Sequence, residues 1–254
     1  MKNNLLFDTA IFLEKVTDCF YAAKENKWWD NDMKKIDDDW ANLSEIIDNK
    51  TNLIASEAME MFECMRNGSY AKPKSDIYLD YENMATDLYA SLFKEHVKDT
   101  YEDELADVYI RVCDLVGFLL YFELAREAKT PLLEYDPRSK TKFLSDIKGL
   151  CKKGESFLES IILPIQPTEE TIVGSIFKDF LFCCLDSSRR LTDYFLVDIV
   201  DGVPESKDVL YYCSILFPHL LVFVEHKEVN LNYHVKAKLA YNTTRGAKHG
   251  GKKF

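Results

Sequence analysis

The spacing of apolar side chains predicts two helices in the first quarter of the chain. One covers about Leu5 to Lys24, and a longer one covers Trp40 to Met65 and stops at Asn67-Gly68, a pair typical of a helix C-terminus. The segment between them, Lys27 to Asp39, is rich in Asp, Asn and Lys and shows no helical period. We therefore expect a loop there.

The helical pattern continues along the rest of the chain. Asp80 to Lys98 is compatible with a helix, and Asp99-Thr100 offers an N-cap for another that runs to Ala128. Further helices are expected over Lys142–Leu163, Thr168–Val200, Lys207–Lys227 and Leu231–Asn242. Only 9 Gly and 7 Pro interrupt the chain, too few for the turns of a β-sandwich or barrel. The sequence therefore predicts an all-α protein built as a helical bundle.

The charge balance limits the classes of ligand. Acidic side chains outnumber basic ones by 43 to 32, which gives a formal net charge of −11. A protein of this charge repels polyanions, so we expect no nucleic acid partner. Nucleotides stay open as ligands, because a divalent metal ion can supply the positive charge that the chain lacks.

The cysteines and the apolar runs indicate the compartment. The seven cysteines form no CxxC pair and lie in apolar runs, which is typical of buried thiols in a reducing environment. The longest apolar stretches, Leu115 to Phe122 and Leu216 to Val224, are too short for a bilayer or are interrupted by Pro218-His219, and no signal peptide is evident. We expect a soluble cytoplasmic protein with no membrane partner.

Two predicted helices each carry a pair of acids three residues apart. Glu57 and Glu60 form the first pair, and Glu104 and Asp107 form the second. This spacing puts both acids of a pair on one helical face, so antiparallel packing would bring four carboxylates together as ligands for Mg²⁺ or Mn²⁺. The alternative is that each acid pair lies on a solvent-exposed face of its helix. A di-iron bundle is disfavoured, because none of the five histidines follows a Glu by three residues.

Four stretches resemble the MazG-like all-α nucleoside triphosphate pyrophosphohydrolases, relatives of the dimeric dUTPases. Lys27 to Asp30 looks like the tryptophan loop of that family, and Asn52 to Glu60 looks like its first metal helix. Glu104 to Gly117 is similar to the second metal helix over its whole length. Lys238 to Arg245, followed by Lys248 to Lys252, resembles the phosphate-binding tail, and the order of all four stretches is that of the family.

The resemblance implies Mg²⁺-dependent hydrolysis of a nucleoside triphosphate, expected to be a deoxynucleotide, to the monophosphate and pyrophosphate. It implies that the metal ligands are Glu57, Glu60, Glu104 and Asp107, with Glu57 or Glu60 as the catalytic general base. The phosphate ligands would be Lys238, Asn242, Arg245 and Lys252. The nucleobase would stack on Trp28 and Trp29, and the metal ligands would be oriented by Arg111 and Asp114. Two alternatives stay open at this point: one tryptophan anchors its loop to the core, and Lys252 belongs to a solvated terminus.

The resemblance also suggests a division of the chain. Residues 1–125 form the metal-binding bundle, 126–225 an inserted helical region that packs on it, and 226–254 the last helix and basic tail. The insert either replaces a subunit interface or decorates a homodimer, and we expect the homodimer. A dUTPase-like hydrolase is the alternative activity. A helical protein that binds a nucleotide or a partner without catalysis is the alternative class.

Overall fold

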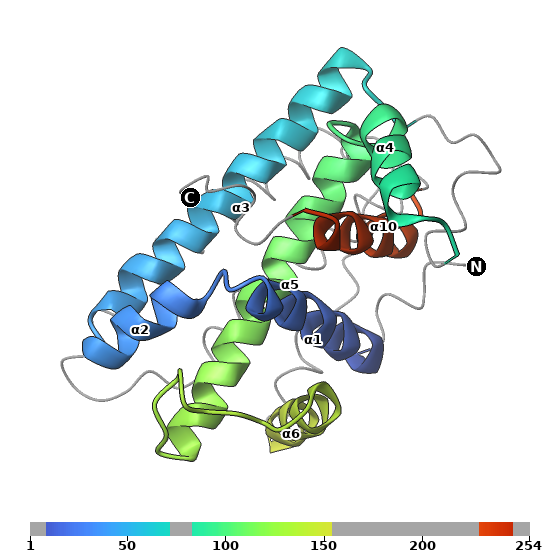
Figure 1. Ribbon diagram of the computed structural model, residues 1–254. Helices are drawn as coiled ribbons and strands as arrows, with labels where there is room; N and C mark the ends of the chain where they lie inside the picture. The colour runs from blue at the N-terminus through green and yellow to red at the C-terminus, as the bar shows by residue number, and fades with distance from the viewer. Residues whose placement is uncertain (1–8, 72–82, 154–228, 246–254) are drawn as a thin grey trace.

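The protein is all-α in the part that the structure describes. The computed structural model describes residues 9–71, 83–153 and 229–245, and within these ranges it contains helices and no strand (Figure 1). The helices are α1 (Thr9–Glu25), α2 (Asp30–Asp38), α3 (Asn42–Asn67), α4 (Thr86–His96), α5 (Tyr101–Glu127), α6 (Lys140–Lys153) and α10 (Leu231–Thr243). The predicted fold class is confirmed.

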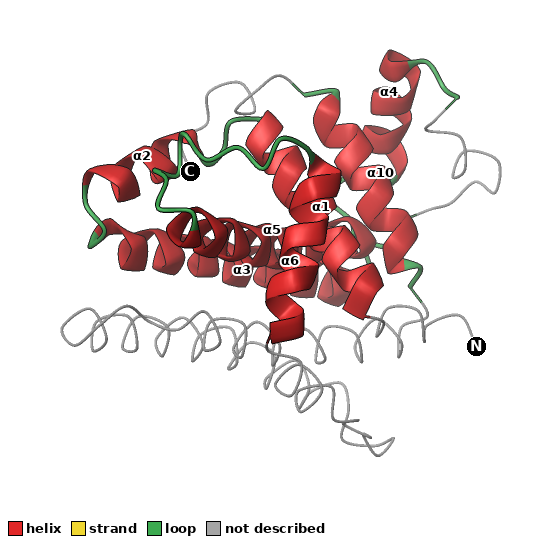
Figure 2. Cartoon of the chain, turned by 90° about the horizontal axis from the view of Figure 1, so that it is seen from below, coloured by secondary structure: helices red, strands yellow, loops and turns green. Residues whose placement is uncertain are grey.

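Helix α5 is the centre of the bundle. It contacts α1, α3, α6 and α10 (Figure 2). Most of its residues are buried, including the whole run from Val112 to Ala125. A helix that is apolar around most of its circumference needs neighbours on all sides, which explains this position. Helix α3 lies along α5 and runs in the opposite direction (Figure 1), as the convergence of the two acid pairs requires.

A glycine lets α1 approach α5 closely. A Cβ atom on Gly117 would lie 2.5 Å from the Cβ of Phe20 and 3.2 Å from the carbonyl oxygen of Val16. Both α1 residues are fully buried. The contact therefore needs a residue without a side chain at position 117.

The end of α3 confirms the predicted stop at Asn67-Gly68. Gly68 has φ 67°, the left-handed conformation that glycine adopts without strain, and its N–H donates to the carbonyl of Met65. The next N–H, of Ser69, donates to the carbonyl of Cys64 at 2.8 Å. These bonds satisfy two carbonyls of the last turn and turn the chain away from the helix axis.

The loop predicted for Lys27 to Asp39 is wrong, because Asp30–Asp38 forms α2. Its buried residues, Met33 and Ile36, follow the buried Trp29 at steps of four and three, which is a helical face. The many polar residues lie on the solvent side and hide this short period. The helix predicted from Asp80 also begins later, since α4 starts at Thr86 after a turn.

Helix α4 packs on α10 through a second, smaller core. The Tyr89 hydroxyl donates to the carbonyl of Ala237 at 2.7 Å, and the rings of Phe93 and Tyr241 stack with centroids 4.3 Å apart. Helix α10 in turn packs on α5. The segment that separates the two acid pairs in sequence therefore helps to hold the last helix against the second pair.

The predicted region 126–225 is described only in part. Helix α6 covers the start of the helix predicted over Lys142–Leu163 and packs on α1 and α5. The helices predicted over Thr168–Val200 and Lys207–Lys227 lie outside the described residues. Helix α10 matches the prediction over Leu231–Asn242 to within one residue.

Candidate metal centre

Three of the four predicted metal ligands lie together between α3 and α5. Glu57 of α3 and Glu104 and Asp107 of α5 each offer a carboxylate oxygen, and these oxygens all lie within 4.8 Å of one another. Glu104 is buried, and the Glu57 side chain is only 12% exposed. The antiparallel packing of α3 and α5 brings these three carboxylates together (Figure 1).

Glu60, the fourth predicted ligand and an alternative general base, is not part of the cluster. Its side chain is exposed, and no group of possible metal ligands among the described residues includes it. Three residues advance a helix by about 300°, so Glu60 lies about 60° further than Glu57 from the buried stripe of Ile54, Ala58 and Met61. The structure therefore does not bring Glu60 together with the other three predicted ligands.

An ion-paired lysine borders the cluster. The Lys238 ammonium of α10 donates to Asp103 Oδ1 and lies against Asp107 Oδ2, both at 2.7 Å. The side chains of Lys238 and Asp103 are 6% and 1% exposed. Burial alone lowers the pKa of Lys238, but Asp107 and Asp103 outweigh it and raise that pKa above the ordinary value. Lys238, predicted to bind phosphate, is thus already engaged with two carboxylates.

Asp103 is the residue of this site that sequence reasoning missed. It lies in the first turn of α5, where an acidic side chain is explained well enough by the positive end of the helix. The signal that could have found it is its spacing of four residues before Asp107, which places both carboxylates on one face. That spacing provides two acceptors for a single lysine.

The carboxyl groups of the cluster have too few cationic neighbours to offset their burial and their mutual repulsion. Burial, together with the neighbouring Asp107, raises the pKa of Glu57 to about 7 and that of Glu104 to about 8. Arg111 opposes this for Glu57, because its Nε lies 3.4 Å from Glu57 Oε1. A bound cation would stabilise the charged forms of these carboxyl groups.

Arg111 and Asp114 occupy different environments. Arg111 contacts Glu57, as predicted for a residue that orients a metal ligand, and its guanidinium lies 5.3 Å from the centre of the Trp28 ring. Asp114 instead accepts a hydrogen bond from Trp29 Nε1 at 2.7 Å. Burial raises the pKa of Asp114 to about 7. In this structure Asp114 holds the tryptophan in place, and its role beside the metal ligands stays a prediction.

Trp29 cannot stack on a nucleobase in this structure. It is fully buried, its ring stacks on Phe118 with centroids 4.0 Å apart, and the Lys50 ammonium lies 4.1 Å from its centre. With both faces in contact with protein, Trp29 is the tryptophan that anchors its segment to the core. Trp28 is half-buried and next to Arg111, so it is the one that stays a candidate for base stacking.

The predicted phosphate ligands on the last helix lie near the carboxylates to different degrees. Asn242 follows Lys238 by one turn on α10 and is buried, and its Oδ1 has no hydrogen-bond partner among the described residues. Arg245 lies just after α10, and its guanidinium is 5.7 Å from the centre of the Tyr241 ring. Lys252 lies outside the described residues.

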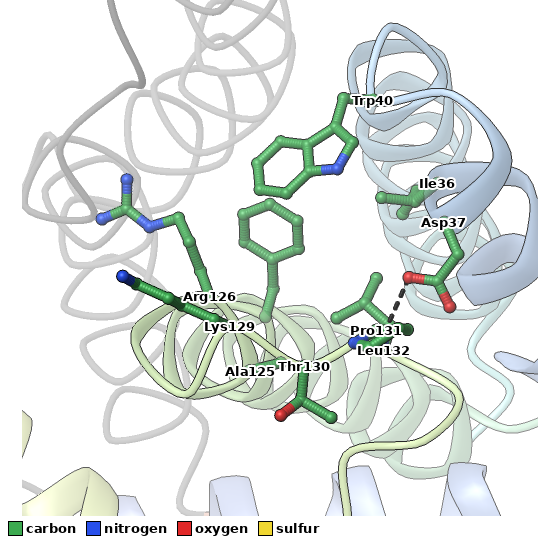
Figure 3. Close-up of a pocket in the computed structure, with 10 residues that line it drawn as sticks. Ile36, Asp37, Trp40, Ala125, Arg126, Lys129, Thr130, Pro131 and Leu132 are labelled. Carbon is green, nitrogen blue, oxygen red and sulfur yellow. Dashed lines mark hydrogen bonds between the residues drawn. The ribbon is translucent and has the colours of Figure 1, made fainter.

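A cavity of about 290 Å³ lies elsewhere, at the C-terminal end of α5 (Figure 3). Figure 3 shows Trp40 above the cavity and the carboxylate of Asp37, which accepts the backbone N–H of Leu132 at 2.7 Å, on one side. Arg126 and Lys129 lie on the other side. The cavity contains none of the predicted site residues, and about 20 residues of α5, or roughly 30 Å, separate it from Glu104.

Comparison of the chain with protein-family models, with curated proteins and with solved structures gives no match. Helices of the described segments are all too short or too polar to cross a membrane.

Proposed function

We propose that the chain is a Mg²⁺-dependent nucleoside triphosphate pyrophosphohydrolase, which cleaves between the α and β phosphates and releases the monophosphate and pyrophosphate. The observation that carries the proposal is the cluster of Glu57, Glu104 and Asp107, three carboxylates from two antiparallel helices within 4.8 Å. This donor set fits a hard cation, since Mg²⁺ and Mn²⁺ prefer carboxylate oxygens. The burial of the cluster supports the same assignment, because buried acids without a cation are costly.

The three clustered carboxylates would hold the ion. When bound, Mg²⁺ supplies Lewis-acid chemistry that neutralises the charge of the phosphates. Arg111 keeps one oxygen of Glu57 in place by contact with Oε1. The other oxygen of that carboxylate is our candidate to accept a proton from the attacking water.

The last helix would bind the triphosphate. Lys238 uses two of its three N–H donors for Asp103 and Asp107, which leaves one for a phosphate oxygen. The amide of Asn242, one turn further along α10, is buried, and its Nδ2–H₂ group would be the donor to a phosphate oxygen. Arg245 adds a guanidinium next to the helix end, a group suited to bidentate contact with phosphate.

The proposal is tested by measuring pyrophosphate and phosphate release from a panel of ribo-, deoxy- and modified nucleoside triphosphates, with Mg²⁺ or with EDTA. For Glu57→Gln we expect kcat/KM to fall by at least roughly 100-fold, because a ligand of the ion and the proposed base is lost. Glu60→Gln is the matched control on the same helix, and we expect a loss of less than about tenfold, since Glu60 lies outside the cluster.

The outcomes separate the alternatives. Metal-dependent pyrophosphate release from several nucleotides supports the proposal, whereas release from dUTP alone supports the dUTPase-like activity. If no nucleotide is hydrolysed although the folded protein binds Mg²⁺, the hydrolase assignment is wrong and the chain is a binding protein. Equal losses for Glu57→Gln and Glu60→Gln would contradict the site geometry.

A further inference from the structure

The site around Lys238 contains more carboxyl groups than one metal ion needs as ligands. Besides Glu57, Glu104 and Asp107, a second group of Asp99, Asp103 and Glu104 also has oxygens within 4.8 Å of one another. Two overlapping acidic groups would suit two divalent cations held a few ångströms apart, as in two-metal hydrolytic sites. The positions of the charges around Asp103 decide between one cation and two.

Asp103 has no oxygen without a donor. Its Oδ1 accepts the Lys238 ammonium at 2.7 Å, and its Oδ2 accepts the backbone N–H of Asp99 at 3.1 Å. Asp99 itself is exposed and pairs with Lys98. Two members of the second acidic group, Asp99 and Asp103, therefore already have partners within the protein.

The ammonium of Lys238 lies between Asp103 and Asp107, one carboxylate from each of the two acidic groups. It bridges Asp103 Oδ1 and Asp107 Oδ2, and its surroundings are closed by the Phe93 ring, whose centre is 5.8 Å from Nζ. A positive charge at this point repels a divalent ion between the same two carboxylates. The second oxygen of Asp107 is left to share with Glu57 and Glu104.

The position of the ammonium is fixed by the fold. Helix α4 holds α10 through the bond from Tyr89 to Ala237 and through the stack of Phe93 on Tyr241. Lys238 and Ala237 are both buried in this contact. The lysine is thus placed by packing on two sides and by ion pairs on the third.

We propose that Lys238 serves as a built-in second cation, so that the site takes one divalent ion, on Glu57, Glu104 and Asp107, with Asp103 as the positioning residue for the ammonium. This inference rests on the proposed function, because it assumes that the cluster binds a divalent cation. It deepens that function by setting the number of ions and by giving Lys238 a role before the nucleotide arrives.

The test is the number of Mn²⁺ ions bound per chain, measured without nucleotide on the full-length protein by electron paramagnetic resonance of free Mn²⁺ and by calorimetry. We expect one ion for the wild type and two for Lys238→Met, which removes the ammonium and keeps most of the length of the side chain. Lys236→Met is the matched control, since Lys236 is exposed on the same helix, and one ion is expected. In the double variant Asp103→Asn with Lys238→Met, the number should return to one.

The number of bound Mn²⁺ ions tests the role of Lys238 separately from the existence of the metal site. Two ions in the wild type, or one ion in a folded Lys238→Met variant, would overturn the role of Lys238 and leave the metal site intact. No bound Mn²⁺ in the folded wild type would overturn the metal site and the inference together. If Lys238→Met does not fold, as circular dichroism would reveal, the wild-type number still decides, because two ions contradict a built-in cation and one ion supports it.

Discussion

The indole of Trp29 is held on three sides. Phe118 covers one face, the Lys50 ammonium lies at the other, and Nε1–H donates to Asp114. Asp114 is itself buried, so this hydrogen bond is a main support for its carboxylate. The residue therefore contributes to stability, and its neighbour Trp28 is left as the candidate for contact with a base.

Replacing Trp29 should separate these two roles. Trp29→Phe keeps the stack on Phe118 but removes the N–H donor, and we expect the free energy of unfolding to fall by about 3 kcal/mol because Asp114 loses its partner. The KM for the best nucleotide should stay within twofold. Trp28→Ala should raise that KM by roughly fivefold or more, since a stacking surface is lost.

Urea denaturation and steady-state kinetics of the two variants provide the measurement. If Trp29→Phe left stability unchanged and raised KM as Trp28→Ala does, the indole would have to face the ligand, and the buried position of Trp29 would be wrong.

At the scale of elements, the contact of α1 with α5 depends on Gly117. A methyl group there would lie 2.5 Å from Phe20 Cβ, and the nearby carbonyl of Val16 belongs to the backbone of α1, so the helix would have to move. We expect Gly117→Ala to lower the free energy of unfolding by about 2–3 kcal/mol.

Gly149 in α6 is the matched control. Nothing lies within 4 Å of a Cβ at that position, so Gly149→Ala should raise stability by about 0.5–1 kcal/mol through helix propensity. Equal effects of the two substitutions in guanidinium denaturation would mean that the α1–α5 contact is looser than described.

The elements show where sequence patterns suffice. The end of α3 could be predicted because Gly68 marks it with a local conformation, and α5 could be predicted because its apolar residues continue for seven turns. Helix α2 was missed since only Trp29, Met33 and Ile36 mark its buried face. A nine-residue helix offers too few turns for a period to emerge from a polar background.

Local sequence patterns likewise predict only part of the candidate metal centre. Glu57, Glu104 and Asp107 could be predicted because local spacing and one antiparallel contact bring them together. Glu60 has the same spacing but lies beyond the buried stripe, which depends on how α3 is rotated against α5. The pairing of Lys238 with Asp103 joins residues 135 positions apart, so no local pattern indicates it.

At the scale of the whole molecule, an excess of acids makes stability depend on pH and on cations. The pKa values of Glu57 and Glu104 are raised to about 7 and about 8, above the ordinary value of 4.5. Between about pH 5 and pH 8 these two carboxyl groups therefore bind more protons in the folded protein than in the unfolded chain, and without a metal ion their contribution to stability falls as the pH rises. A divalent ion acts against this loss, because it binds the deprotonated carboxylates.

We expect a fixed Mg²⁺ concentration, about 100 times the Kd measured at pH 8, to raise the melting temperature by about 5 °C or more at pH 8 and by less than half of that at pH 6, where the Kd is higher. Differential scanning calorimetry with and without EDTA provides the measurement, and Glu57→Gln should reduce the shift at pH 8. A shift of the same size at both pH values would show that the ion binds elsewhere or that these carboxyl groups are ionised throughout the range.

The distance along the chain between Asp103 and Lys238 has a consequence for synthesis of the protein. Translation at about 5–20 residues per second needs roughly 7–27 s to add the 135 residues between them. During that time the emerging chain carries the acids of α3 and α5 without the ammonium of α10. Magnesium in the surrounding solution is then the counterion at hand for the nascent helix pair, and a ribosome-bound chain that ends before residue 229 should depend on it more than the finished protein does.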